Sequence, residues 1–445
     1  MEFKALKKSG IFNLLSTFGK EISQPPGIVE WSERAKKEAE INSTVGVATG
    51  KPSEYMDSSS DKVGIFHLSA IKELYNNFKP EQIFGYAPVL GIPSVRNSWK
   101  KWIGFKLKDH NPAIESIITQ PYAIPGITVG IYVLCRMFLS PTEKAVIPEK
   151  RWGNYDAIIK RNIGAGIQSF TLFRENRFNY EGLKSAIVET AKNQDKAFVL
   201  LNFPNNPTGY SPEKETAEKI CSTLKEAVKE SGKPLIVVTD DAYEGFVYDD
   251  SLKHSIFSHL AELGKDILAV KVDGITKELL FWGGRLGMIT FAIPPYFGDK
   301  GEIELELENK FVGLVRATIS NSTKIIQEGV ASIVSEPDKF LQERERIVSA
   351  IGKKGNALKE ELEKNSSPEI LPDPFNSGFF AFLNIKDVSA EKLADHLLKK
   401  YKIGVIPFEK KKENINGLRL TFSSLSVEEI PRLVAGINNA VADLK

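Results

Sequence analysis

Three segments of the sequence carry polar side chains directly after apolar, β-branched runs. Asn206 lies in the turn-forming segment 202–209, Asp240 stands at the end of the next run, and Lys277 follows the third. Polar groups at the carboxyl ends of parallel strands meet at the edge where open α/β sheets bind ligands. A partly buried carboxylate there needs a cationic partner, which a ligand atom would supply. With Arg285, eight residues beyond Lys277, these groups together predict a ligand site, although each alone also fits a turn or a solvated loop.

A parallel sheet must position these side chains. We expect buried strands at residues 144–148, 196–203, 234–239 and 266–272, separated by amphipathic helices such as 212–230. Strands that alternate with helices in this way predict an α/β fold, here a three-layer large domain with a mostly parallel sheet.

The pattern changes after about residue 335, where a smaller α+β domain is predicted. Its expected helices are 337–364, 390–401 and 427–444, and its expected strands are 379–385, 403–407 and 418–423. A polar helix is expected near residues 31–41. We therefore divide the chain into 1–60, an N-terminal arm and part of the small domain, 61–335, the large domain, and 336–445, the small domain formed with the N-terminal segment.

The composition favours an enzyme that acts on small molecules. The 445 residues include 59 Lys and Arg against 57 Asp and Glu, a net charge of +2, so nothing calls for a nucleic-acid or membrane partner. Cys135 and Cys221 are too few for a disulfide framework, and the five histidines show no metal-ligand spacing, so no metal is expected. A cytoplasmic protein without signal peptide or transmembrane segment is expected.

The chemistry-bearing segments resemble a known family. Asn-Asn-Pro-Thr-Gly at 205–209, Asp-x-Ala-Tyr at 240–243, and Thr-Lys followed by Gly-x-Arg-x-Gly at 276–287, in this order, resemble the class I aminotransferases of the type I pyridoxal-phosphate fold. This aspartate and aromatic aminotransferase group would match from about residue 41 to 440. The resemblance implies a pyridoxal 5′-phosphate enzyme that moves an amino group between an L-amino acid (aspartate, glutamate or aromatic) and a 2-oxo acid such as 2-oxoglutarate.

The resemblance assigns catalytic roles. Lys277 would form the Schiff base with the cofactor's aldehyde and then transfer the substrate's Cα proton. Asp240, preferred over its neighbour Asp241 because it stands three positions before Tyr243, would keep the pyridine nitrogen protonated. Asn206 and Tyr243 would hydrogen-bond the phenolic oxygen of the ring.

The resemblance also implies how the rest of the cofactor is held. Arg285 would bind the phosphate, and the residues expected to assist it are Ile127 and Thr128 in the turn 125–130, Thr276, and Tyr86 from a neighbouring subunit. Many relatives have a serine at the position of Gly274, so Thr276 or a water is expected to compensate. Trp152 would stack on the cofactor plane.

Substrate contacts are implied at four positions. Arg419 matches the arginine that holds the α-carboxylate, and Asn206 and Gly46 would lie on the same side of the substrate. Arg316 would reach into the partner's site of a homodimer and bind a second carboxylate. A surface arginine in an exposed ion pair remains an equally good interpretation of Arg316.

Two other functions stay open from the sequence. A pyridoxal-phosphate-dependent lyase that performs β-elimination would use the same cofactor motifs. A DNA-binding regulator with an aminotransferase-like domain would need a helix-turn-helix module ahead of the fold, and the first 40 residues lack that pattern.

Overall fold

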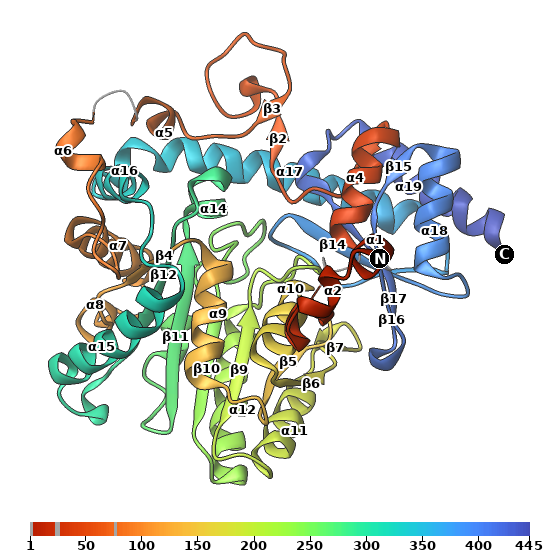
Figure 1. Cartoon of the computed structure of the whole chain (residues 1–445). Helices are drawn as coiled ribbons and strands as arrows, with labels where there is room; N and C mark the ends of the chain where they lie inside the picture. The colour runs from red at the N-terminus through yellow and green to blue at the C-terminus, as the bar shows by residue number, and fades with distance from the viewer. Residues whose placement is uncertain (1–2, 23–26, 75–77) are drawn as a thin grey trace.

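The computed structural model describes residues 3–22, 27–74 and 78–445, so residues 1–2 and 23–26 of the predicted N-terminal arm lie outside the described residues. A seven-stranded sheet forms the centre of the molecule (Figure 1). Its strands, in spatial order, are β4 (Tyr122–Ile124), β12 (Gly287–Phe291), β11 (Ile267–Gly274), β10 (Leu235–Asp240), β9 (Ala197–Asn202), β5 (Lys144–Pro148) and β6 (Gly166–Phe170).

The sheet is mostly parallel. The strands from β6 to β11 pair in parallel, whereas β12 runs antiparallel to both β11 and β4. The four strands expected from apolar runs form at their predicted places. Two of them, β9 and β10, are buried over their whole length, as expected for central strands of a parallel sheet. Helix α9 (Ile127–Phe138) packs on β11 and β12, and α11 (Tyr180–Ala191) packs on β5, β6 and β9, beside α12 (Lys214–Ser231). The predicted three-layer α/β architecture is confirmed.

A second, antiparallel sheet lies in the C-terminal part of the chain. Its strands, in spatial order, are β13 (Ile370–Pro372), β14 (Phe380–Ile385), β17 (Ile415–Thr421) and β16 (Ile406–Lys410). Helix α18 (Ala390–His396) packs on β16 and β17 of this sheet, and α19 (Glu429–Leu444) packs on α18. Figure 1 shows the long helix α17 (Leu341–Asn365) running from the large sheet toward α19.

Two of the expected elements differ in the structure. The predicted strand 403–407 is split into β15 (Ile403–Gly404) and β16, because β15 pairs with β1 (Ile41–Asn42) and β16 pairs with β17. The predicted helix 31–41 is α4 (Ile28–Glu38), which ends earlier because Ile41 enters that pairing. The N-terminal segment is thereby joined to the small α+β unit. Among the described residues, no helix combines the length and the apolar character needed to cross a bilayer.

Candidate active site

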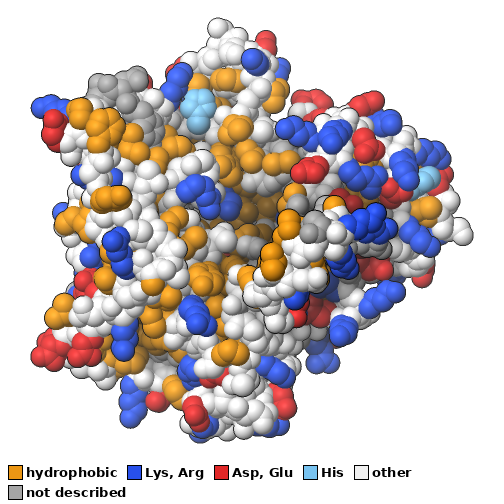
Figure 2. All heavy atoms as spheres, viewed as in Figure 1, with side chains coloured by type: hydrophobic (Ala, Val, Ile, Leu, Met, Phe, Trp, Pro, Cys, Tyr) orange, Lys and Arg blue, Asp and Glu red, His pale blue; other side chains and the backbone are white. Residues whose placement is uncertain are grey.

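A cavity of about 430 Å³ lies at the carboxyl ends of β9, β10 and β11, and residues of the second sheet close it from the other side. Figure 2 shows a hollow in the middle of this face, lined largely by hydrophobic side chains. Of the residues singled out in the sequence, the structure brings these into the cavity wall: Gly46, Ile127, Thr128, Trp152, Asn206, Asp240, Tyr243, Thr276, Lys277, Arg285 and Arg419.

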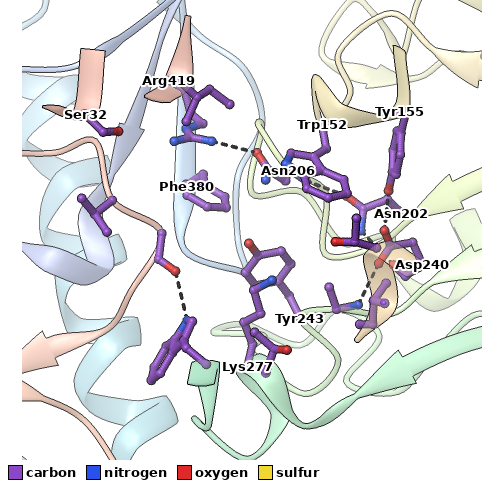
Figure 3. Close-up of a pocket in the computed structure, with 18 of the residues that line it drawn as sticks. Ser32, Trp152, Tyr155, Asn202, Asn206, Asp240, Tyr243, Lys277, Phe380 and Arg419 are labelled. Atoms are coloured by element: carbon purple, nitrogen blue, oxygen red, sulfur yellow. Dashed lines mark hydrogen bonds between the residues drawn. The ribbon is translucent and has the colours of Figure 1, made fainter. Parts of the chain in front are cut away.

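Lys277 lies in the short helix α14 (Ile275–Glu278), directly after β11. Its Nζ is 5.0 Å from the centroid of the Tyr243 ring, and Figure 3 shows the two side chains side by side. Burial lowers the pKa of Lys277 to about 8; Arg285 adds to this shift, whereas Asp240 opposes it. About a tenth of the amine is therefore uncharged at pH 7, far more than in an ordinary lysine, and this form can act as a nucleophile and a base.

Asp240 and Asp241 face different surroundings at the end of β10. Asp240 reaches the cavity, where Tyr155 Oη donates a 2.5 Å hydrogen bond to Oδ2 and the Ala242 amide donates one of 3.1 Å to Oδ1. Asp241 instead accepts a 2.5 Å hydrogen bond from Lys271 Nζ, away from the cavity. Burial raises the pKa of Asp240 to about 6, so a cationic ligand atom beside it would stabilise the ionised carboxylate.

Two residues that were not assigned from the sequence hold Asp240 in place, Tyr155 through the carboxylate and Asn202 through the backbone carbonyl. Tyr155 lies in α10 (Asn154–Asp156) and is almost fully buried. Asn202 stands level with Asp240 on the neighbouring strand, donates to its carbonyl oxygen at 2.8 Å and accepts from the Asn206 amide at 2.8 Å. Asn202 could have been assigned from the sequence, because like Asp240 it ends a buried apolar run. No comparable signal existed for Tyr155, because its partner lies 85 residues away.

Arg419 approaches the cavity from β17. Its Nη1 donates to Asn206 Oδ1 at 3.4 Å (Figure 3), and its Nη2 donates to the Thr44 carbonyl oxygen at 2.9 Å. Its buried Nε has no hydrogen-bond partner among the described residues. The guanidinium lies 4.6 Å from the centroid of the Phe380 ring. Burial lowers the pKa of Arg419 to about 10, so it stays cationic at neutral pH, with a donor available for an anion such as a carboxylate.

A second cationic corner is built from Arg285 and the beginning of α9. Arg285 Nη1 donates to Thr276 Oγ1 at 3.3 Å and to the Trp282 carbonyl oxygen at 3.4 Å. A Cβ placed at Gly126, which has a φ of 87°, would lie 2.5 Å from Arg285 Nη2. The positive φ therefore favours glycine at this position, and the missing side chain leaves room for the guanidinium. Free amide groups at the start of a twelve-residue helix, a hydroxyl at Thr128 and a guanidinium suit a phosphate dianion.

The departure from the usual family pattern at Gly274 has a steric cause. A Cβ at this position would lie 2.6 Å from the Leu286 carbonyl oxygen and 2.7 Å from Gly287 Cα. The backbone of β12 thus comes too close to admit a serine. Thr276, which contacts Arg285, is the hydroxyl that lines the cavity here.

Tyr86 and Arg316 lie outside this cavity. Tyr86 is 93% exposed, and its neighbour Phe84 is 81% exposed. Arg316, near the end of α15 (Lys300–Thr318), is also exposed and donates to Ser320 Oγ at 2.6 Å. Within a single chain, neither side chain contributes to the site.

A network of buried charged side chains contacts Glu278, the residue that follows Lys277. Lys106, on α7 (Pro93–Leu107), donates to Glu278 at 2.5 Å and to Glu244 at 2.6 Å, while Lys271 donates to Glu244 at 2.8 Å. Trp102 on the same helix donates to Glu278 at 2.6 Å. Although burial alone would lower the pKa of Lys106, the carboxylates of Glu244 and Glu278 raise it. The two ammonium groups are shared among four buried carboxylates, those of Asp241, Glu244, Asp273 and Glu278, and these contacts give the network a structural role.

The N-terminal segment also lines the cavity. Ile28 and Ser32 of α4 lie in its wall, and Trp282 Nε1 donates to the Gly46 carbonyl oxygen at 3.3 Å. A Cβ at Gly46 would lie 3.0 Å from the Phe380 ring. The backbone at Gly46 is therefore held close to the centre of the site.

Comparison with known proteins agrees with this geometry. Residues 58–437 match the protein family described as aminotransferase class I and II. An aspartate aminotransferase from Pyrococcus abyssi is 24% identical over 72% of this chain and 75% of its own length. The aromatic-amino-acid aminotransferase 2 of Thermococcus litoralis is 25% identical over 76% and 79%. A solved aminotransferase from Anaerococcus prevotii has a TM-score of 0.81 at 22% identity, with 96% of this chain and 99% of that chain covered, which shows a shared fold.

Proposed function

This chain belongs to the class I and II aminotransferases, which depend on pyridoxal phosphate, and we propose that it exchanges an amino group between aspartate, glutamate or an aromatic L-amino acid and a 2-oxo acid such as 2-oxoglutarate. The observation that carries this proposal is the convergence of Lys277, Asp240 and Arg419 on one cavity. The names of the aspartate and aromatic relatives support the choice of substrates.

The residues present fit the cofactor. Pyridoxal phosphate, when bound, supplies an electron-withdrawing ring that acidifies the substrate Cα–H. Asp240 would hold a proton on the ring nitrogen, and Lys277, with its lowered pKa, would carry the proton to and from the substrate carbon. Asn206 and Tyr243 would hydrogen-bond the ring's phenolic oxygen, and Trp152 would cover the ring.

The phosphate would bind at the corner formed by Arg285 and the start of α9. Ile127, Thr128 and Thr276 line this corner together with the arginine. Tyr86 would add a contact from the neighbouring subunit. Its almost complete exposure, next to exposed Phe84, supports a homodimer in which this surface is covered.

Arg419, with Asn206 and Gly46, would recognise the α-carboxylate that all amino-acid substrates share. Arg419 belongs to the small antiparallel sheet, so substrate binding would draw residues 1–60 and 336–445 toward the large unit of 61–335 and exclude water. A cytoplasmic location is part of the proposal, and both cysteines, free and buried, fit a reducing compartment.

The lowered pKa of Lys277 predicts how cofactor binding depends on pH. Only the uncharged amine reacts with the aldehyde, so the rate at which the apoprotein takes up pyridoxal phosphate should rise with pH and level off above about pH 8. Stopped-flow absorbance measures this rate between pH 6 and 10. A rate that keeps rising to pH 10 would show that the folded protein does not perturb this amine.

Arg316 is expected to bind the side-chain carboxylate of dicarboxylic substrates. Arg316→Ala should raise KM for glutamate and 2-oxoglutarate on the order of 10- to 100-fold, because a charge-assisted contact is lost, and leave KM for phenylalanine nearly unchanged. Steady-state kinetics with both substrate classes measures this, with Lys310→Ala on the same helix as the control. Equal losses for both classes would contradict the role.

A mixing experiment asks whether Arg316 acts across the dimer. A hybrid of Lys277→Ala and Arg316→Ala subunits would contain one site with an intact lysine and a partner that supplies an intact arginine. Mixing the two variants should therefore restore sites with the wild-type KM for glutamate, whereas the Lys277→Ala homodimer is inactive and the Arg316→Ala homodimer shows only the raised KM. Failure to restore it in verified hybrid dimers would place Arg316 outside the partner's site.

A further inference from the structure

Three histidines from two segments that are far apart in the sequence meet on the large α/β unit. His110 follows helix α7, His254 lies in the loop before α13 (Phe257–Leu260), and His259 lies within α13. One nitrogen from each ring lies within 4.8 Å of the other two. The cluster borders a surface cavity that shares no lining residue with the proposed cofactor site.

The nitrogens in this cluster are poorly satisfied. Nε2 of His254 and Nε2 of His259 are buried and have no hydrogen-bond partner among the described residues. Among the described residues, the one ring hydrogen bond in the cluster joins His259 Nδ1 and Ser258 Oγ at 3.2 Å. A buried polar atom without a partner destabilises the fold, so two such atoms in one cluster call for a ligand.

The three imidazoles are also in the form that binds metals. Burial lowers the pKa of all three rings, and burial with the neighbouring rings and Lys214 lowers that of His259 to about 3. Lone pairs are therefore present at neutral pH, without competition from protons. Three protonated imidazoles this close together would repel one another, which also favours the neutral rings.

We infer that His110, His254 and His259 bind a first-row transition-metal dication, with Zn²⁺ as the reference ion, at a site separate from the cofactor cavity. Three histidines with one open position are a common Zn²⁺ environment. At Zn–N distances of about 2.0–2.1 Å, tetrahedral ligand atoms lie about 3.3 Å apart. The nitrogens would have to approach one another by about 1.5 Å at most, starting from separations within 4.8 Å.

Binding requires the rings to turn. The His110 and His259 rings stack with centroids 3.7 Å apart and planes inclined at 28°, so their lone pairs do not yet point at one atom. The rings are half-buried, and the one ring hydrogen bond among the described residues, between His259 Nδ1 and Ser258 Oγ, is the contact that such a turn would have to break. The open position would face the surface cavity, where Glu218 and Lys225 lie and a water can complete the coordination. The ion would tie the end of α7 to the segment that leads into β11.

Zinc binding to the holoenzyme tests this inference without reference to turnover. Tag-free protein with its cofactor bound is titrated with Zn²⁺ alone in a calorimeter, and then with Co²⁺ while the d–d absorption is recorded. We expect one ion per chain with a Kd on the order of 1 µM or tighter, and a tetrahedral Co²⁺ spectrum. No binding at micromolar concentrations, or binding only as an adventitious ion at several weak sites, would overturn the inference.

Variants locate the site. His254→Gln and His259→Gln should each weaken Zn²⁺ binding by at least about 100-fold, whereas His67→Gln, a half-buried histidine outside the cluster, should bind as the wild type does. An unchanged cofactor absorption band shows that each variant is folded. His110→Gln, at the more exposed ring, serves if an inner variant fails to fold. Unchanged affinity in a folded cluster variant would refute the assignment.

Discussion

Lys277→Ala is expected to lower the rate of transamination by about 10⁵-fold or more, since the same amine would anchor the cofactor and carry the substrate proton. The structure supports both roles, because this amine lines the cavity and its pKa is lowered to about 8. The purified variant should bind pyridoxal phosphate only reversibly and lose it on dialysis. Absorbance before and after dialysis, together with single-turnover kinetics, measures the two effects.

The matched control is Lys253→Ala, which removes an exposed lysine outside the cavity and should leave both properties unchanged. A small primary amine added to Lys277→Ala should restore part of the rate, because it replaces the missing base. Full activity of the alanine variant would remove the chemical basis of the proposed mechanism.

The second large effect separates two adjacent carboxylates. Asp240→Asn should lower kcat by about 10²- to 10³-fold, because the neutral amide no longer stabilises a proton on the ring nitrogen. Its effect on the unfolding free energy should be small, since burial already raises the pKa of Asp240 and makes its charge unfavourable without a ligand.

Asp241→Asn is predicted to lower the stability of the fold and to leave kcat unchanged. It removes the carboxylate that lies 2.5 Å from buried Lys271, whose ammonium group keeps Glu244 at 2.8 Å, so it should lower the unfolding free energy by about 1–3 kcal/mol while the folded fraction keeps its kcat. Denaturant unfolding and kinetics on both variants measure the contrast. If Asp241→Asn damaged kcat and Asp240→Asn damaged only stability, the two assignments would have to be exchanged.

Local sequence signals were enough to place much of the site. Apolar runs predicted β9, β10 and β11, and the polar residues that end these strands meet in one cavity because parallel strands bring their carboxyl ends together. Arg419 could be included because its segment resembles a family motif. The positions of these residues are fixed by where the strands end, and the sequence pattern predicts those ends.

The remaining features depend on tertiary contacts that no local pattern encodes. Tyr155 becomes the partner of Asp240 only when two strand ends meet, and the glycine at 274 is required by the backbone of β12. The expectation that the histidines lack a metal-ligand arrangement rested on sequence spacing alone, whereas His110 meets the other two rings through long-range packing. Long-range packing sets these contacts.

The most direct test of the central proposal is the visible spectrum of the holoenzyme during a half-reaction. Glutamate, aspartate, phenylalanine or tyrosine is added first without any 2-oxo acid, and 2-oxoglutarate follows. We predict that at least one of these amino acids abolishes the cofactor's absorption band with release of a single equivalent of 2-oxo acid per site, and that 2-oxoglutarate restores the band. Continued release of 2-oxo acid without an acceptor would indicate elimination, and an unchanged band with all four amino acids would contradict the proposed substrates.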